Sequence, residues 1–213
     1  MIVARIKRLI ARARGIARTP HAARRLTREE MNALPPFDAL GLESVVEVDS
    51  AESATRAFAA LSRETVVGFD TESRPTFAKG EVSRGPHVVQ FAARRRTYVF
   101  TLHNAECRRV VRELIGSAAL TKVGFGLDQD RRLIPIRLNV HPQALVDLET
   151  LFAQRGYGRG VGVKAGIAIA LKRRFFKSKK ISTTNWSRYR LTPQQLLYAA
   201  NDAYAALCAY QSL

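Results

Sequence analysis

The chain has 213 residues, enough for one globular domain with a sizeable core and an extension. Its apolar fraction of 46% excludes a largely disordered chain, and no run of roughly 18 apolar residues is present to form a membrane-spanning helix. Lys and Arg number 35 against 18 Asp and Glu, which gives a formal net charge of +17 and a pI near 10.8. This excess favours a polyanionic partner, nucleic acid first and an anionic membrane surface second, over a protein whose basic charge only keeps it soluble.

The two cysteines indicate the cellular compartment of the protein. Cys107 and Cys208 are the only cysteines, and they show neither a metal-binding spacing nor a disulfide framework. Reduced thiols are the simplest interpretation, so we expect an intracellular and most simply cytoplasmic protein.

Residues 1–36 are predicted to form a basic extension. Apolar residues recur near helical spacing among basic ones: Ile2, Val3, Ile6, Leu9, Ile10, Ala13 and Ala17 with Arg5, Lys7, Arg8, Arg12 and Arg14. Such a segment suits a mitochondrial targeting sequence, a membrane-surface helix or an arm that contacts phosphates, and a solvated extension rich in Ala and Arg is the simplest alternative. Thr27 to Glu30 has the spacing of a capping box, and Pro35-Pro36 ends the short helix that follows.

The remaining segment, 37–213, is predicted to be one α/β domain. The expected elements are strand 44–48, helix 51–61, strand 65–70, loop 73–86, strands 87–92 and 97–102 around a turn at 94–96, helix 106–115, strand 120–124 and a helix beginning at 128. The last helix has the clearest start: Thr192 is the N-cap, Pro193 fits the first turn, and Gln195 completes a capping box. Strands that come first and then alternate with helices indicate a mixed sheet flanked by helices.

Two pairs of side chains carry oxygen ligands. Asp70 and Glu72 are two apart at the end of a predicted strand, so both carboxylates point to one side. Tyr198 and Asp202 are four apart on the last helix and share one face. Each pair alone is common by chance, but their order in the chain, with a third acidic segment between them, predicts a site for hard divalent cations.

The third segment runs from Lys122 through Gly124 and Gly126 to Asp128 and Asp130, a strand that leads into an acidic helix start. With this segment in place, residues 40–213 resemble the DEDDy 3′–5′ exonuclease family, which includes RNase D, the proofreading domains of DNA polymerases and the Werner-type exonucleases. The glycine-rich second motif is most similar to the Werner-type branch. The resemblance implies an RNase H-like fold (DnaQ-like exonuclease) with a mixed central sheet flanked by helices.

The resemblance assigns roles to five residues of this chain. It implies that Asp70, Glu72, Asp130 and Asp202 hold two Mg²⁺ or Mn²⁺ ions and that Tyr198 orients the attacking water. Four carboxylates balance the charge of two divalent ions roughly 3.5–4 Å apart, which can stabilise both attack on a phosphodiester and departure of the leaving oxygen. Tyrosine is a poor base at its ordinary pKa near 10, so the metal must supply most of the activation of the water.

The chain departs from the family pattern at three places. Ser73 follows Glu72 where many relatives carry an apolar or aromatic wedge, and Arg190 stands where many have proline. The second motif also offers two acids; family spacing favours Asp130, whereas Asp128 is interpreted as a helix cap or solvated acid.

A basic stretch lies between the second and third motifs. It could follow a phosphate backbone or be a solvated helix end, and its members are Lys172, Arg173, Arg174, Lys177, Lys179 and Lys180. The motifs and the resemblance together predict a metal-dependent 3′–5′ exonuclease, and the resemblance implies that it releases nucleoside 5′-monophosphates from DNA or RNA. The alternative is a nucleic-acid-binding module without activity.

Overall fold

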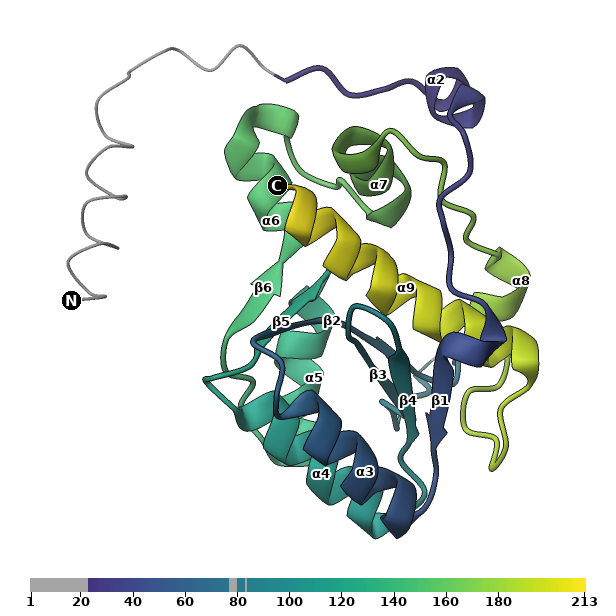
Figure 1. Cartoon of the computed structure of the whole chain (residues 1–213), viewed down its shortest axis with the longest axis vertical. Helices are drawn as coiled ribbons and strands as arrows, with labels where there is room; N and C mark the ends of the chain where they lie inside the picture. The colour runs from purple at the N-terminus through teal and green to yellow at the C-terminus, as the bar shows by residue number, and fades with distance from the viewer. Residues whose placement is uncertain (1–22, 77–79, 83) are drawn as a thin grey trace, which may run out of the picture.

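The computed structural model describes residues 23–76, 80–82 and 84–213, and its centre is a six-stranded sheet (Figure 1). The strands are β1 (Val45–Val48), β2 (Val66–Glu72), β3 (Val88–Ala92), β4 (Thr97–Thr101), β5 (Thr121–Gly124) and β6 (Leu145–Asp147). They are arranged in the order β1-β4-β3-β2-β5-β6. β3 is antiparallel to both of its neighbours, whereas the pairs β1–β4, β2–β5 and β5–β6 are parallel. This confirms the predicted mixed sheet.

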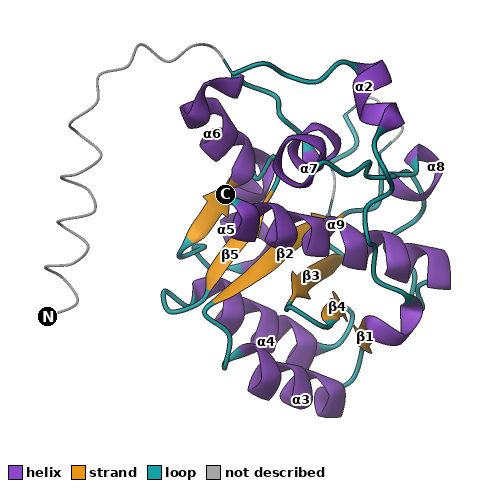
Figure 2. Ribbon diagram, turned by 45° about the horizontal axis from the view of Figure 1, so that its top comes forward, coloured by secondary structure: helices purple, strands orange, loops and turns teal. Residues whose placement is uncertain are grey.

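Helices cover both faces of the sheet (Figures 1 and 2). The helices are α2 (Arg28–Ala33), the 3-10 turn η1 (Leu42–Ser44), α3 (Ala51–Leu61), α4 (Ala105–Gly116), α5 (Asp128–Leu138), α6 (Leu148–Phe152) continued by the π-helical turn η2 (Ala153–Tyr157), α7 (Val163–Leu171), α8 (Lys179–Ser182) and α9 (Pro193–Ser212). α3, α4 and α5 pack on one face. α9 crosses the other face, and α6 and α7 pack against its C-terminal half.

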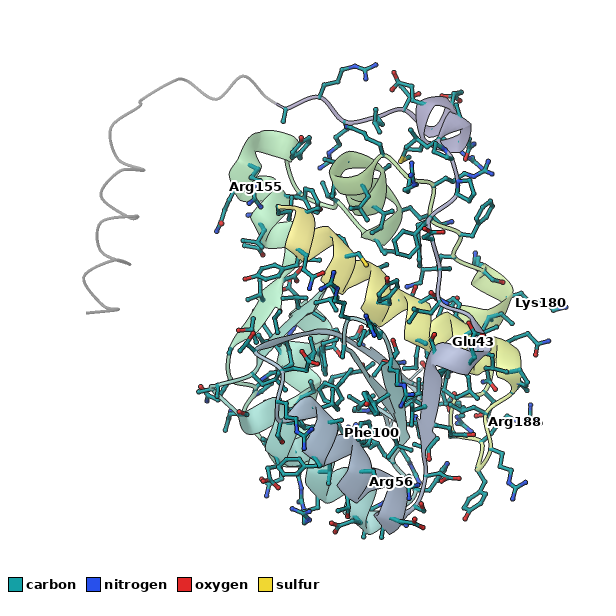
Figure 3. The ribbon with its side chains drawn as sticks, in the orientation of Figure 1. Glu43, Arg56, Phe100, Arg155, Lys180 and Arg188 are labelled. Atoms are coloured by element: carbon teal, nitrogen blue, oxygen red, sulfur yellow. The ribbon has the colours of Figure 1, made fainter. Side chains whose placement is uncertain are left out.

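The alternation of side chains in β2 separates the core from the site. Val67 and Phe69 belong to the cluster with α3 and α4, which also contains Phe100, seen pointing into that layer in Figure 3. Gly68 and Asp70, which alternate with them, therefore face α9. The strand thus contributes its apolar side chains to the core and its carboxylates to the opposite face.

Most of the local predictions outside residues 139–182 are confirmed. The helix at 51–61 is observed with those bounds, the turn at 94–96 joins β3 to β4, and the capping boxes at Thr27 and Thr192 both form. The strand expected at 65–70 extends to Glu72, so both acids of the first motif lie within β2. From 139 to 182, however, the prediction contained none of the short elements β6, α6, α7 and α8.

The segment before the sheet contacts the domain from Ala23, whose N–H donates to the carbonyl of Gly156, and it packs on aromatic rings at Phe37. Phe37 contacts the rings of Phe175 and Tyr204 at centroid distances of 5.6 and 5.9 Å, and Leu40 exchanges hydrogen bonds with the Asn201 side chain. α2 has no buried residue. The hypotheses about the basic residues of 1–22 lie outside the described residues. Within the described part of the chain, no helix has the length and apolar character needed to cross a membrane.

Candidate active site

Gly68 lets α9 lie directly on β2. A Cβ atom at this position would be 1.9 Å from the carbonyl oxygen of Ala203 on α9, so only glycine fits. Asp202 precedes Ala203, and Asp70 lies two residues beyond Gly68. The close approach of helix and strand therefore brings the first and third motifs together.

Three of the four predicted metal-binding carboxylates meet at this contact. Within the described part of the chain, Asp70, Glu72 and Asp202 form one cluster whose ligand oxygens all lie within 4.8 Å of one another. Asp202 is only 5% exposed. Clustered carboxylate oxygens are the ligands that Mg²⁺ and Mn²⁺ prefer, so the donor set fits a hard divalent cation.

The electrostatics of the cluster also favour a cation. Burial raises the pKa of Asp70, although the ammonium of Lys177 and the N–H of Thr71 partly offset this effect. Burial, with the nearby charges of Asp70 and Asp202, raises the pKa of Glu72 to about 9. Burial likewise raises the pKa of Asp202 to about 7, although Lys177 opposes the shift. The three acids thus oppose each other's ionisation, and additional positive charge would stabilise their ionised forms.

Lys177 supplies the positive charge that the structure shows. Its Nζ lies 2.6 Å from Oδ2 of Asp202 and 5.4 Å from the centre of the Tyr198 ring. Burial would lower the pKa of this lysine, but Asp202 and Asp70 outweigh burial and raise it. The sequence hypothesis placed Lys177 in a solvated or phosphate-binding stretch, and its contact with the carboxylate cluster was missed.

Tyr198 lies one helical turn before Asp202, as predicted, and borders the cluster. Its ring packs against the fully buried Trp186 at a centroid distance of 5.9 Å. Burial and the charge of Asp202 raise the pKa of the phenol above its ordinary value, so it is neutral near pH 7. The hydroxyl can therefore orient a water molecule but is a weak base.

Asp130 lies beside the cluster rather than within it. The hydroxyl of Thr71 donates a hydrogen bond of 2.6 Å to its carboxylate. Burial first, and then the charge of Asp70, raises the pKa of Asp130 to about 6. Asp128, the other acid of the second motif, is exposed in the first turn of α5, which fits a solvated acid. The structure therefore places Asp130 next to Asp70, whereas its role as a metal ligand stays a prediction.

Asp147 shapes the loop that leads to Asp130. Its carboxylate accepts hydrogen bonds from the N–H groups of Gly126, Leu127 and Glu149 at 3.1, 2.7 and 2.9 Å. Gly126 has φ of +67°, a conformation that favours glycine. Asp147 thus joins the end of β6 to the start of α5. The pairing between β5 and β6 that makes this contact could not be read from the sequence.

The basic stretch between the motifs divides into exposed and buried positions. Lys172, Arg173, Lys179 and Lys180 are exposed. Arg174 is half-buried; it lies 4.6 Å over the Phe176 ring and donates to the carbonyl of Asn32. α7 ends at Leu171, with Lys172 at its C-cap, so the helix-end interpretation holds for Lys172. Lys180 points outward from α8, and Arg188 does so from the loop before α9 (Figure 3).

Cavities border the carboxylate cluster on two sides. One of about 310 Å³ is lined by Phe37, Phe176, Tyr198 and Asp202, among others. A second of about 270 Å³ is lined by Asp70, Phe125, Lys177 and Asp202, among others. A third, of about 470 Å³, lies beyond Glu72, and its lining includes Arg74, Glu81, Arg84, His87 and Arg137. The sequence hypotheses assigned no binding role to these last residues, which are scattered between 74 and 137 and form no local run.

The comparisons with known proteins agree with this geometry. The family model described as 3'-5' exonuclease matches residues 45–213, so the chain belongs to the 3′–5′ exonuclease family. The predicted membership of its DEDDy type and the predicted RNase H-like fold are confirmed.

Two curated relatives illustrate the match. The chain is 28% identical over 155 residues to the mouse bifunctional 3'-5' exonuclease/ATP-dependent helicase WRN, covering 72% of this chain and 11% of that protein. It is 31% identical over 150 residues to a 3'-5' exonuclease of Arabidopsis thaliana, covering 69% and 52%. The match thus spans about a tenth of one relative and half of the other.

Solved structures share the fold at low sequence identity. The EXO domain of Aedes aegypti Nibbler superposes with a TM-score of 0.68 at 19% identity, covering 83% of this chain and 89% of that one. Trypanosoma brucei RNase D in complex with GMP gives 0.68 at 18% identity, covering 81% and 57%. Escherichia coli RNase D gives 0.65 at 17% identity, covering 78% and 43%.

Proposed function

We propose that this chain is a metal-dependent 3′–5′ exonuclease that hydrolyses the terminal phosphodiester bond of a nucleic acid and releases nucleoside 5′-monophosphates. The observation that carries the proposal is the cluster of Asp70, Glu72 and Asp202, with Tyr198 one turn from Asp202. A fold of this family with an inactive site would have no need for three carboxylates brought together in a partly buried place, since their burial and mutual repulsion are unfavourable.

The carboxylates would hold Mg²⁺ or Mn²⁺. Asp70, Glu72 and Asp202 would be the principal ligands, and Asp130, whose carboxylate accepts a hydrogen bond from Thr71, would supply a further oxygen. When bound, such ions neutralise negative charge on the phosphate and make water more acidic. The protein contributes a rigid frame, because β2 lies inside the sheet and α9 is fixed by its capping box and by its contact at Gly68.

Tyr198 would orient the attacking water. The phenol is neutral at pH 7, it lies on the same helical face as Asp202, and its ring is held by Trp186. A hydroxyl in this position can accept one hydrogen bond and donate another, so it fixes the direction of attack without taking the proton permanently.

Basic side chains around the site suit the polyanionic substrate. Arg74, which pairs with Glu81, and Arg84 line the cavity beyond Glu72, and Lys179 and Lys180 extend from α8 on the other flank. Trypanosoma brucei RNase D has been solved with RNA U12 and with GMP, which supports nucleic acid and a nucleoside monophosphate as ligands here. We propose that the strand's backbone phosphates lie along these residues while its 3′ end enters the carboxylate cluster.

The test uses the purified chain with DNA and RNA oligonucleotides labelled at the 5′ end or at the 3′ end. With Mg²⁺ or Mn²⁺, 5′-labelled strands should shorten in single-nucleotide steps, and 3′-labelled strands should release label as a mononucleotide at once. Excess chelator and the variant Asp70→Asn, which keeps the shape of the side chain, should both abolish the reaction. Binding of the strand without any cleavage under all metal conditions would show an inactive nucleic-acid-binding module instead.

A further inference from the structure

Lys177 lies in the position of a cation within the proposed metal site. Its Nζ is 2.6 Å from Oδ2 of Asp202, and its side chain lines the same cavity as Asp70. The side chain of Asp202 is 4% exposed, whereas that of Lys177 is 34% exposed. The ammonium therefore reaches a buried carboxylate from a stem that is open to solvent.

The segment that carries Lys177 has a fixed anchor and an open end. Phe175 is 5% exposed and packs edge-on against Phe37. Phe176, the next residue, is 69% exposed, and α8 begins only at Lys179. Lys177 thus follows a fixed residue by two positions, and its long flexible side chain has room to change direction.

A divalent ion and this ammonium compete for the same oxygen. A metal held by Asp202 would stand within a few ångströms of Nζ, where two positive charges repel strongly at the dielectric of a partly buried site. Once the ions neutralise the carboxylates, the lysine has lost its partner. A phosphate oxygen of the substrate would be the nearest anion to offer it a new one.

We propose that Lys177 is a tethered counter-ion: it pairs with Asp202 in the metal-free enzyme and transfers to a substrate phosphate when divalent ions bind. This inference rests on the proposed function, because it requires that Asp202 be a metal ligand. Lys177 is then a positioning residue that couples the two binding events. Metal binding alone leaves its charge unpaired, and phosphate binding relieves that penalty, so each ligand strengthens the other.

The test is a titration of the full chain with Mn²⁺, following free Mn²⁺ by electron paramagnetic resonance with and without GMP. Lys177→Met keeps the length of the side chain and removes its charge. It should bind Mn²⁺ about tenfold more tightly than wild type without GMP, and it should lose most of the gain in Mn²⁺ affinity that GMP gives to wild type. The matched control is Lys172→Met, which removes one positive charge from an exposed position at the end of α7 and should titrate as wild type does.

A second variant keeps the inference testable if Lys177→Met does not fold. Lys177→Arg retains a cation that can pair with Asp202, so its Mn²⁺ affinity and its response to GMP should stay close to those of wild type. Unchanged or weaker Mn²⁺ binding in Lys177→Met, or unchanged coupling to GMP, would overturn the counter-ion role. If wild type binds Mn²⁺ and degrades oligonucleotides while the variant shows no difference, only the lysine inference fails. If wild type binds no Mn²⁺, the metal-dependent function fails with it.

Discussion

Gly68 sets the distance between α9 and the sheet, so one added methyl group tests how the site is assembled. In Gly68→Ala the new Cβ would lie 1.9 Å from the carbonyl oxygen of Ala203 and 3.2 Å from Cβ of Ala92. Real contacts of this kind are longer than about 3 Å, so helix and strand have to separate by roughly 1 Å. Asp202 and Asp70 are attached to those two elements close to the contact, so the separation passes directly into the carboxylate cluster.

Two effects of this substitution can be estimated, one on stability and one on rate. Overpacking of a tight contact typically destabilises a protein by about 1–3 kcal/mol, because side chains and backbone must shift. A displacement of about 1 Å in a catalytic arrangement can lower the rate roughly 10²-fold. We therefore expect Gly68→Ala to fold with reduced stability and to lose about two orders of magnitude in the rate of mononucleotide release.

Two assays on one preparation separate these effects. Urea unfolding measures stability, and the initial rate with Mg²⁺ at saturating 5′-labelled oligonucleotide measures catalysis under conditions where the variant is folded. The control is Gly116→Ala at the end of α4, where the new Cβ meets only the Val140 side chain at 3.2 Å. That variant should keep its activity and its stability within about 1 kcal/mol. Wild-type rate and stability in Gly68→Ala would show that this contact does not set the geometry of the site.

Three further predictions address the site and the core. Tyr198→Phe should lower the rate roughly 10²–10⁴-fold while the ring still packs against Trp186; a rate within twofold of wild type in the same assay would assign Tyr198 to packing. Asp70→Asn and Asp202→Asn should abolish metal-dependent hydrolysis while oligonucleotide affinity, measured by fluorescence anisotropy, changes little; cleavage at the wild-type rate in either would contradict the metal site. Lys122 is 0% exposed, and burial lowers its pKa to about 8. The charged form of Lys122 therefore destabilises the fold below that pH, and the stability of the wild type should rise between about pH 8 and 10.5. Lys122→Met should therefore be more stable than wild type by about 2–3 kcal/mol at pH 7, even though it loses the hydrogen bond to the carbonyl of Ser117. Urea unfolding should show this difference in stability shrinking between about pH 8 and 10.5. A difference independent of pH would refute the lowered pKa of Lys122.

The parts of the fold that depend on local rules could be predicted from the sequence. The capping box at Thr192 fixed the start of α9 and therefore the shared face of Tyr198 and Asp202. The apolar run before Asp70 identified β2, because a buried strand that ends in acids has few alternatives. Because side chains alternate along a strand, the same prediction placed Asp70 and Glu72 on one side of β2.

The segment from 139 to 182 lacked such signals. β6 has three residues and α8 has four, which is too short for any periodicity to show. α7 is apolar around most of its surface, because it is buried between α6 and α9. Lys177 could not be distinguished from the exposed lysines near it, since only the fold shows which one approaches Asp202. Sequence identified the chemistry of the motifs, whereas non-local packing decided which basic residue joined them.

Two glycines, Gly68 and Gly124, shape the site as much as the carboxylates do. Asp70 meets α9, and the hydroxyl of the next residue, Thr71, holds Asp130 of α5 beside Asp70. Gly68 admits α9, and a Cβ at Gly124 would lie 2.5 Å from the carbonyl oxygen of Phe69, so this second glycine admits the end of β5. A slip of one residue in the register of β2 would exchange its two faces and separate the carboxylates. The carboxylate cluster is therefore specified by the close approach of three backbone segments along one strand, and the acidic side chains meet only because glycine makes that approach possible.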